Sequence, residues 1–136
     1  MTTWRSFVLL GALNGFIGVA LGAFGAHGLE GTLDPEMLRV WNKGVDYQQI
    51  HALGLLLVGI LLRFESCRRI RLAGWCLLIG ILLFSGSLYA LALSGLRPLG
   101  AVTPFGGVSF LIGWALLALG AISPQEKNTG NRRRAG

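Results

Sequence analysis

Residues 72–96 read LAGWCLLIGILLFSGSLYALALSGL and contain no Asp, Glu, Lys or Arg. An α-helix needs about 20 mostly apolar residues to cross the hydrocarbon core of a bilayer, so this run is long enough to span a membrane. Charge returns at Arg71 on one side and at Arg97 on the other. The run therefore predicts a transmembrane helix over residues 72–95.

Three further charge-free runs surround this one, and they cover Ser6–Leu29, Tyr47–Leu62 and Pro98–Gln125. They predict spans over residues 6–27, 46–63 and 104–122. The second run is short, so we expect its helix to extend outward past Asp46, or the bilayer to thin around it. The predicted fold is an all-α four-transmembrane-helix bundle. It forms one domain over residues 1–124, and a disordered basic tail follows over residues 125–136.

Composition supports a lipid environment. Of the 136 residues, 13% are charged and 53% are hydrophobic, whereas about a quarter of a soluble domain is charged. So few charges could not cover a water-facing surface of this size, and the lipid bilayer is the expected partner. The net charge of +6 comes from loops and a tail between apolar runs, which argues against a nucleic-acid-binding face.

The segment before the second span has a helical start of its own. Asp34-Pro35 is a typical N-cap followed by proline at the first helical position. Charged residues from Glu36 to Asp46 recur on one side, and apolar residues that include Trp41 occupy another. We expect a short amphipathic helix over residues 35–45. It either lies in the membrane interface with Trp41 as an anchor, or forms the outer turns of the second span.

The distribution of lysine and arginine predicts the orientation, because cytoplasmic loops carry the excess of positive charge. The loop between the second and third spans and the C-terminal tail are rich in these residues, and Arg5 precedes the first span. We therefore expect both termini on the cytoplasmic side of the inner (plasma) membrane. The N-terminal segment also resembles a cleavable signal peptide, but we favour an uncleaved helix because an h-region typically has only about 7–15 residues.

Glycines in the first span recur at alternating steps of four and three residues, and a second row in the fourth span is spaced by sevens. Such rows let helix backbones approach closely, which drives association where the hydrophobic effect is absent. The predicted packing residues are Gly11, Gly15, Gly18, Gly22, Gly25, Gly106, Gly113 and Gly120. A further small-residue row, Gly86, Ala90 and Ser94, marks the third span. We predict a closely packed bundle, with one row left for a second copy.

When residues are counted inward from the predicted ends, polar side chains from all four spans are expected to fall in one layer near the outer surface. The candidate ligand-binding residues are His27, Tyr47, Gln48, His51, Tyr89 and Thr103. Their convergence suits a binding pocket, and it equally suits an ordinary interfacial belt. Asn14 lies beside the first glycine row, where an interhelical hydrogen bond is the expected role.

Chemistry at this layer is the weaker alternative. Two histidines at one depth would suit a haem or metal held between helices, yet membrane histidines commonly just hydrogen-bond a neighbouring helix. Cys67 and Cys76 show neither pairing nor metal-ligand spacing. The sequence contains no phosphate-binding loop, dinucleotide fingerprint or nucleophile elbow. We therefore expect no cofactor, no metal, no catalytic residues and no enzymatic activity.

The motifs together resemble a known family. They are GAFGAH over residues 22–27, Tyr47-Gln48 with His51, FSGSLY over residues 84–89, and Thr103-Pro104 with Gly106-Gly107, Phe110 and Gly113-Trp114. This combination resembles the bacterial inner-membrane family called domain of unknown function 423, which is similar to the eukaryotic transmembrane protein 256. The resemblance extends from the first span to about Ile122 and implies a four-span inner-membrane protein. It implies no activity.

Three functional hypotheses follow from the sequence. The leading one is a structural or accessory membrane protein that associates with itself or joins a larger complex. The alternative is a component that binds or transports a small ligand, lipid or solute through the outer polar layer. A redox protein carrying haem or metal comes last.

Overall fold

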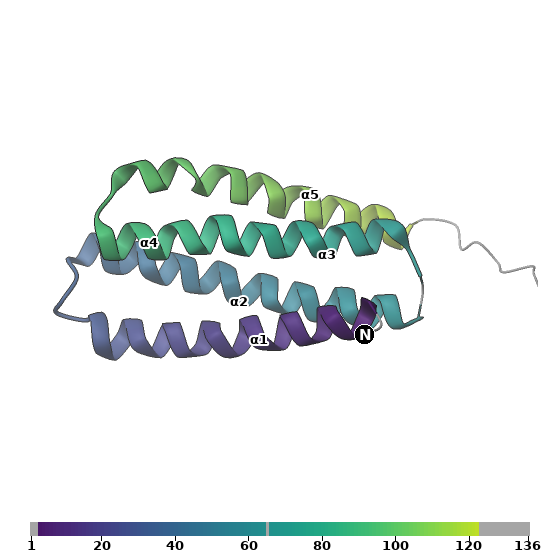
Figure 1. Cartoon of the computed structure of the whole chain (residues 1–136), viewed down its shortest axis with the longest axis horizontal. Helices are drawn as coiled ribbons and strands as arrows, with labels where there is room; N and C mark the ends of the chain where they lie inside the picture. The colour runs from purple at the N-terminus through teal and green to yellow at the C-terminus, as the bar shows by residue number, and fades with distance from the viewer. Residues whose placement is uncertain (1–2, 65, 123–136) are drawn as a thin grey trace, which may run out of the picture.

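Four helical segments of this chain are long and apolar enough to cross a membrane, and they run antiparallel in chain order (Figure 1). The computed structural model describes residues 3–64 and 66–122. The segments cover Thr3–Leu29, Pro35–Phe64, Arg68–Ser94 and Arg97–Ala121. The all-α, four-span fold predicted from the sequence is confirmed. The tail predicted over residues 125–136 lies outside the described residues.

Two of the four segments contain a π-helical turn. The first consists of α1 (Thr3–Phe24) and the π turn η1 (Gly25–Leu29), and the second is the single helix α2 (Pro35–Phe64). The third is interrupted in its middle, and the fourth begins with a 3₁₀ turn. Their parts are α3 (Arg68–Gly80), η2 (Ile81–Ser85) and α4 (Gly86–Ser94), then η3 (Arg97–Ala101) and α5 (Thr103–Ala121). Gly95 ends α4 with a φ of 68°, a conformation that favours glycine.

The helix α2 is longer than the charge-free run inside it, as expected, and this decides between the two roles predicted for residues 35–45. Asp34 caps its start, since the carboxylate accepts the backbone N–H groups of Glu36 at 2.8 Å and Met37 at 3.0 Å. The helix then continues without a break to Phe64. Residues 35–45 are therefore the outer turns of the second span and not a separate interfacial helix. Trp41, expected as an interface anchor, is only 2% exposed.

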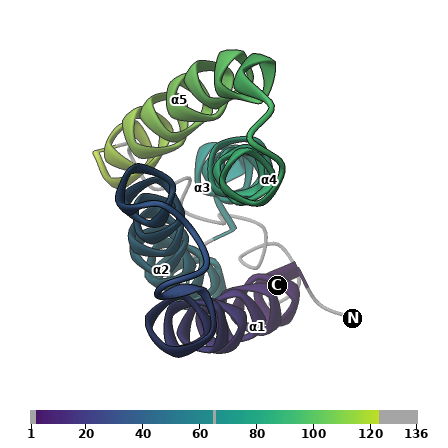
Figure 2. The same cartoon turned by 90° about the vertical axis from the view of Figure 1, so that its left-hand side faces the viewer.

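The helix α2 is central and α1 is peripheral. Figure 2 shows α1 and α5 on opposite sides, with α2 and the α3–α4 segment between them. The helix α1 packs mainly on α2, and α5 packs on α3 and η2. Only Phe7, Gly11 and Gly18 of α1 are buried, whereas ten residues of α2 are. The outward surface of α1 is thus left to lipid or to another protein.

The apolar interior consists of two clusters at different depths. One cluster, near the connection between η1 and α2, contains Leu29, Trp41, Val45 and Ala92. The other cluster, nearer the N-terminus of α1, contains Phe7, Leu55, Val58, Ile70, Ala73, Leu77, Ile81, Phe110 and Leu117. Along α2, the predicted polar residues at 47, 48 and 51 fall between the two. The structure therefore places a polar layer inside the bundle, between two apolar ones.

Candidate functional site

The glycine row of α1 faces α2, and most of it is in close contact. A methyl group added at Gly11 would lie 2.8 Å from the backbone nitrogen of Leu56, and one at Gly25 would lie 2.7 Å from the indole of Trp41. Gly18 and Gly22 have neighbours on α2 at 3.0 and 3.3 Å by the same measure. The row therefore packs α1 onto α2 within one chain.

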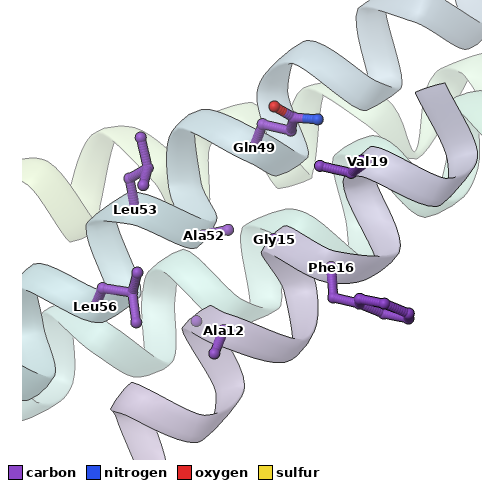
Figure 3. Close-up of a pocket in the computed structure, with 9 residues that line it drawn as sticks. Ala12, Gly15, Phe16, Val19, Gln49, Ala52, Leu53 and Leu56 are labelled. Atoms are coloured by element: carbon purple, nitrogen blue, oxygen red, sulfur yellow. The ribbon is translucent and has the colours of Figure 1, made fainter. Parts of the chain in front are cut away.

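Gly15 is the exception in this row, because an added methyl group would meet no atom within 4 Å. The helices α1 and α2 leave a groove at this point, with a volume of about 310 Å³ (Figure 3). Its lining is apolar apart from Gln49. The lining residues are Gly11, Ala12, Gly15, Phe16, Val19, Gln49, Ala52, Leu53 and Leu56.

The glycine row of α5 packs against the third segment. Gly106 lies against the backbone and Cβ of Phe84, Gly113 against Leu77 and the carbonyl oxygen of Ala73, and Gly120 against Ile70. Ser109 reinforces this contact by donating its hydroxyl to the carbonyl oxygen of Cys76 at 2.7 Å. The row predicted over Gly86, Ala90 and Ser94 points elsewhere, since all three residues are exposed.

Five isolated glycines also make close contacts, and the sequence rows did not include them. Each lies under a larger side chain of another helical segment, and three of these side chains are aromatic. The pairs are Gly44 with Tyr89, Gly54 with Leu77, Gly59 with Val8, Gly74 with Phe7 and Gly80 with Phe110. These glycines form no row along their helices, so spacing could not identify them as packing residues. Only the partner on another helix does so.

Gln48 is the centre of the buried polar layer. Its amide nitrogen donates to the carbonyl oxygen of Asn14 at 3.1 Å, and its amide oxygen accepts the hydroxyl of Tyr89 at 2.8 Å. Gln48 is 3% exposed. The side chain of Asn14 bonds within its own helix, to the carbonyl oxygen of Leu10. Gln48 thus joins α1, α2 and α4 by hydrogen bonds at a depth where lipid could not replace them.

Tyr47 and His51 belong to an aromatic stack on another face of α2. The ring of His51 lies parallel to that of Phe110, with the two centroids 3.4 Å apart. Tyr47 stacks on Phe84 with a centroid distance of 4.3 Å. Nδ1 of His51 is 2.6 Å from the carbonyl oxygen of Tyr47, so Nδ1 carries a proton and donates it in this arrangement. The stack fills the space between α2 and α5.

The remaining candidates lie apart from these two groups. Thr103 pairs with Ser87, their hydroxyl oxygens 2.8 Å apart, and so joins α5 to α4. His27 is exposed in η1. The contact between Gln48 and Asn14 sets the level of Gln48 along the first segment. His27 follows Asn14 in this segment, and at about 1.5 Å per helical residue it lies roughly 20 Å farther along the bundle than Gln48. The structure therefore does not bring His27 and His51 together, as a shared haem or metal would require.

Metal-binding clusters are likewise not found among residues 3–64 and 66–122, where no group of three or more His, Cys, Asp or Glu side chains converges. Cys67 and Cys76 are both free and partly buried. Ser85 is fully buried, and its hydroxyl has no hydrogen-bond partner in this part of the chain. The candidate residues inside the bundle are thus paired or stacked side chains.

The hydrogen bond between Tyr89 and Gln48 provides a test of this layer. Replacing Tyr89 with phenylalanine is expected to lower the free energy of unfolding by about 0.6–1.7 kcal/mol, the range for interhelical hydrogen bonds in membranes. Tyr47→Phe is the matched control, because the Tyr47 hydroxyl has no hydrogen-bond partner among the described residues. Titration with a denaturing detergent in mixed micelles would measure the free energy of unfolding of both variants. Equal losses for the two variants would contradict the assignment.

Comparisons with known proteins agree with the architecture. The family described as "Protein of unknown function (DUF423)" matches residues 21–107. The UPF0382 membrane protein SERP0230 of Staphylococcus epidermidis is 50% identical over 118 residues, which are 87% of this chain and 96% of that protein. The UPF0382 membrane protein YwdK of Bacillus subtilis is 47% identical over 119 residues, 87% and 97% of the two chains. No solved structure gives a significant match.

Proposed function

This chain belongs to the DUF423 family, and we propose that it is a structural or accessory component of the bacterial inner membrane, without catalytic activity of its own. It acts by docking its helices against other membrane-embedded helices. The observation that carries this proposal is that the polar side chains best suited to a ligand bind each other instead. Gln48 bonds Tyr89 and Asn14, and Ser87 pairs with Thr103.

The arrangement does not favour the two alternatives. A site for a small ligand, lipid or solute needs polar groups directed into a cavity, but Tyr47 and His51 pack face to face with aromatic rings. A haem held by two histidines needs them at one level, and His27 and His51 are far apart along the bundle. The surface that remains for a partner is the outside of the bundle.

The proposed orientation places the N-terminus of α1 and the loop between α2 and α3 in the cytoplasm. Basic residues gather at this end, where the guanidinium groups of Arg5 and Arg63 lie over the ring of Trp4 at 5.2 and 4.9 Å. Arg68, Arg69 and Arg71 lie at the same end. Retention of positive charge in the cytoplasm supports this orientation.

Single-cysteine labelling tests the orientation. In a background with Cys67→Ser and Cys76→Ala, Thr32→Cys is expected to react with a membrane-impermeant maleimide added to intact cells. Ser66→Cys, exposed at the other end, is expected to react only after lysis. The reverse pattern would place the termini outside.

Extraction of the protein with a lipid-retaining copolymer tests the accessory role. Native mass spectrometry is expected to show particles that contain more than one polypeptide, and therefore more than the 14.5 kDa of a single chain. Particles that contain a single copy of the chain with lipid alone would contradict the proposal.

A further inference from the structure

The groove between α1 and α2 is a gap in an otherwise close helix pair. Gly11 and Gly18, on either side of it, both meet α2, but nothing fills the space beside Gly15. The groove opens outward, on the peripheral helix of the bundle. Either lipid or another helix must fill it in the membrane.

Gln49 decides between these occupants. Its side chain lies against Gly18, since a methyl group there would be 3.0 Å from its Cγ. Gly18 is close to the middle of the charge-free run Ser6–Leu29, so the amide lies near the centre of the bilayer. The Gln49 amide has no hydrogen-bond partner among the described residues. Lipid esters are about 15 Å away at the edge of a hydrocarbon core of about 30 Å, so acyl chains alone would leave the amide unsatisfied.

A second copy of this chain can satisfy the amide. A carboxamide carries both donors and an acceptor, so two Gln49 side chains related by a twofold axis can bond each other. Small residues beside them let the backbones approach. Phe16 lies next to the groove, is 74% exposed and points away from α2 (Figure 3), so its ring is available to contact a second copy. Each Phe16 can enter the groove of the opposite copy.

We propose that the groove beside Gly15 is the docking site for a second copy of this chain, in a twofold dimer joined by Gln49 and Phe16. The inference rests on the proposed function, because it names the surface and the partner through which helix docking occurs. It also gives a role to the open face of α1, which has fewer buried residues than α2.

Cysteine crosslinking in native membranes locates the interface. In the background with Cys67→Ser and Cys76→Ala, the variant Ala12→Cys is expected to form a disulfide-linked dimer on mild oxidation. Leu111→Cys is the matched control, because Leu111 is 71% exposed on α5 and lies outside the groove. Dimers formed equally by both variants, or by Leu111→Cys alone, would overturn the proposal.

Measuring dimerisation in liposomes tests the contributions of Gln49 and Phe16 to the interface. Gln49→Leu is expected to weaken dimerisation about three- to twenty-fold, as for loss of an interhelical hydrogen bond, and Phe16→Ala is expected to weaken it as well. Leu57→Ala, an exposed residue of α2 outside the groove, is expected to leave it unchanged. Single-molecule photobleaching over a range of protein-to-lipid ratios gives the dimer fraction. Thermal unfolding of each variant as a detergent-solubilised monomer verifies the fold. Dimerisation unaffected by both Gln49→Leu and Phe16→Ala would overturn the proposal.

Other occupants give distinct results. A complex that contains one copy of this chain with a different protein would overturn the dimer and leave the accessory function standing. A monomer whose groove is labelled by a lipid with a photoactivatable acyl chain would overturn the dimer in favour of lipid. Single-chain particles under every condition would contradict both the dimer and the accessory function.

Discussion

Replacing Trp41 with alanine is expected to lower the free energy of unfolding by about 3–5 kcal/mol, the range for truncating a buried aromatic side chain. The indole joins three elements. It lies over Gly25 of η1, its centroid is 4.7 Å from that of Tyr89 on α4, and its Nε1–H donates to the carbonyl oxygen of Leu21 at 3.0 Å. The substitution removes all three contacts and leaves a cavity between α1, α2 and α4.

Two control variants separate the contributions of packing and hydrogen bonding. Trp41→Phe keeps most of the ring and loses the bond to Leu21, so a loss of about 0.6–1.7 kcal/mol is expected. Trp75→Ala truncates a tryptophan that is 48% exposed, and its effect is expected to be less than half that of Trp41→Ala. Thermal and denaturing-detergent unfolding in the same micelles would measure all three. If Trp41→Ala and Trp75→Ala destabilised the protein equally, Trp41 would be a lipid-facing residue, as its sequence context suggested.

The four spans could be predicted because their signal is local. A charge-free run such as Leu72–Leu96 is bounded by arginines, and hydrocarbon excludes charge whatever the neighbouring helices are. The start of α2 was equally local, since Asp34 and Pro35 are adjacent and the cap needs no distant residue. Where a membrane helix continues into charged sequence, its extent depends on contacts with other helices, so the local sequence does not predict it. Residues 35–45 looked interfacial because of their charges, but the apolar side with Trp41 packs onto α1 and α4.

The candidate site could be predicted only in part, because depth was counted from the wrong reference. Tyr47 and His51 were counted from the start of the charge-free run, but α2 begins twelve residues before Tyr47, at Pro35. They therefore lie deep inside the bundle, while His27 is at the end of the bundle, in η1. Rotation about the helix axis was the second unknown. Gln48 and His51 are close in sequence, yet Gln48 points toward Tyr89 and Asn14, and His51 points toward Phe110.

The glycines, too, could be predicted only as far as their local spacing allows, because their contacts depend on the neighbouring helix. The spacing in α1 indicated a packing face, but it could not distinguish Gly11, which meets the backbone of α2, from Gly15, which meets nothing within 4 Å. That distinction depends on where the two helices diverge. The position that departs from the row is also the one beside the proposed docking groove.

Gly106 and Gly107 are consecutive residues of α5, and their replacement by alanine is expected to have different effects on stability. A methyl group at Gly106 would lie 2.8 Å from the Cα atom of Phe84 and 2.7 Å from its Cβ. Backbone atoms cannot yield as a flexible side chain can, so α5 must move away from η2. We expect Gly106→Ala to lower the free energy of unfolding by about 1–3 kcal/mol, the usual cost of overpacking.

A methyl group at Gly107 would instead lie 3.9 Å from the ring of Phe84, an ordinary van der Waals distance. Alanine is also the better helix former, by about 1 kcal/mol. Gly107→Ala is therefore expected to leave the stability unchanged or to raise it. Because both variants add the same methyl group to neighbouring positions, their difference in unfolding free energy isolates the contact between α5 and Phe84. Equal effects in denaturing-detergent unfolding would mean that α5 is not held against Phe84 at this point, and the pairing of Thr103 with Ser87 one turn away would then have to be revised as well.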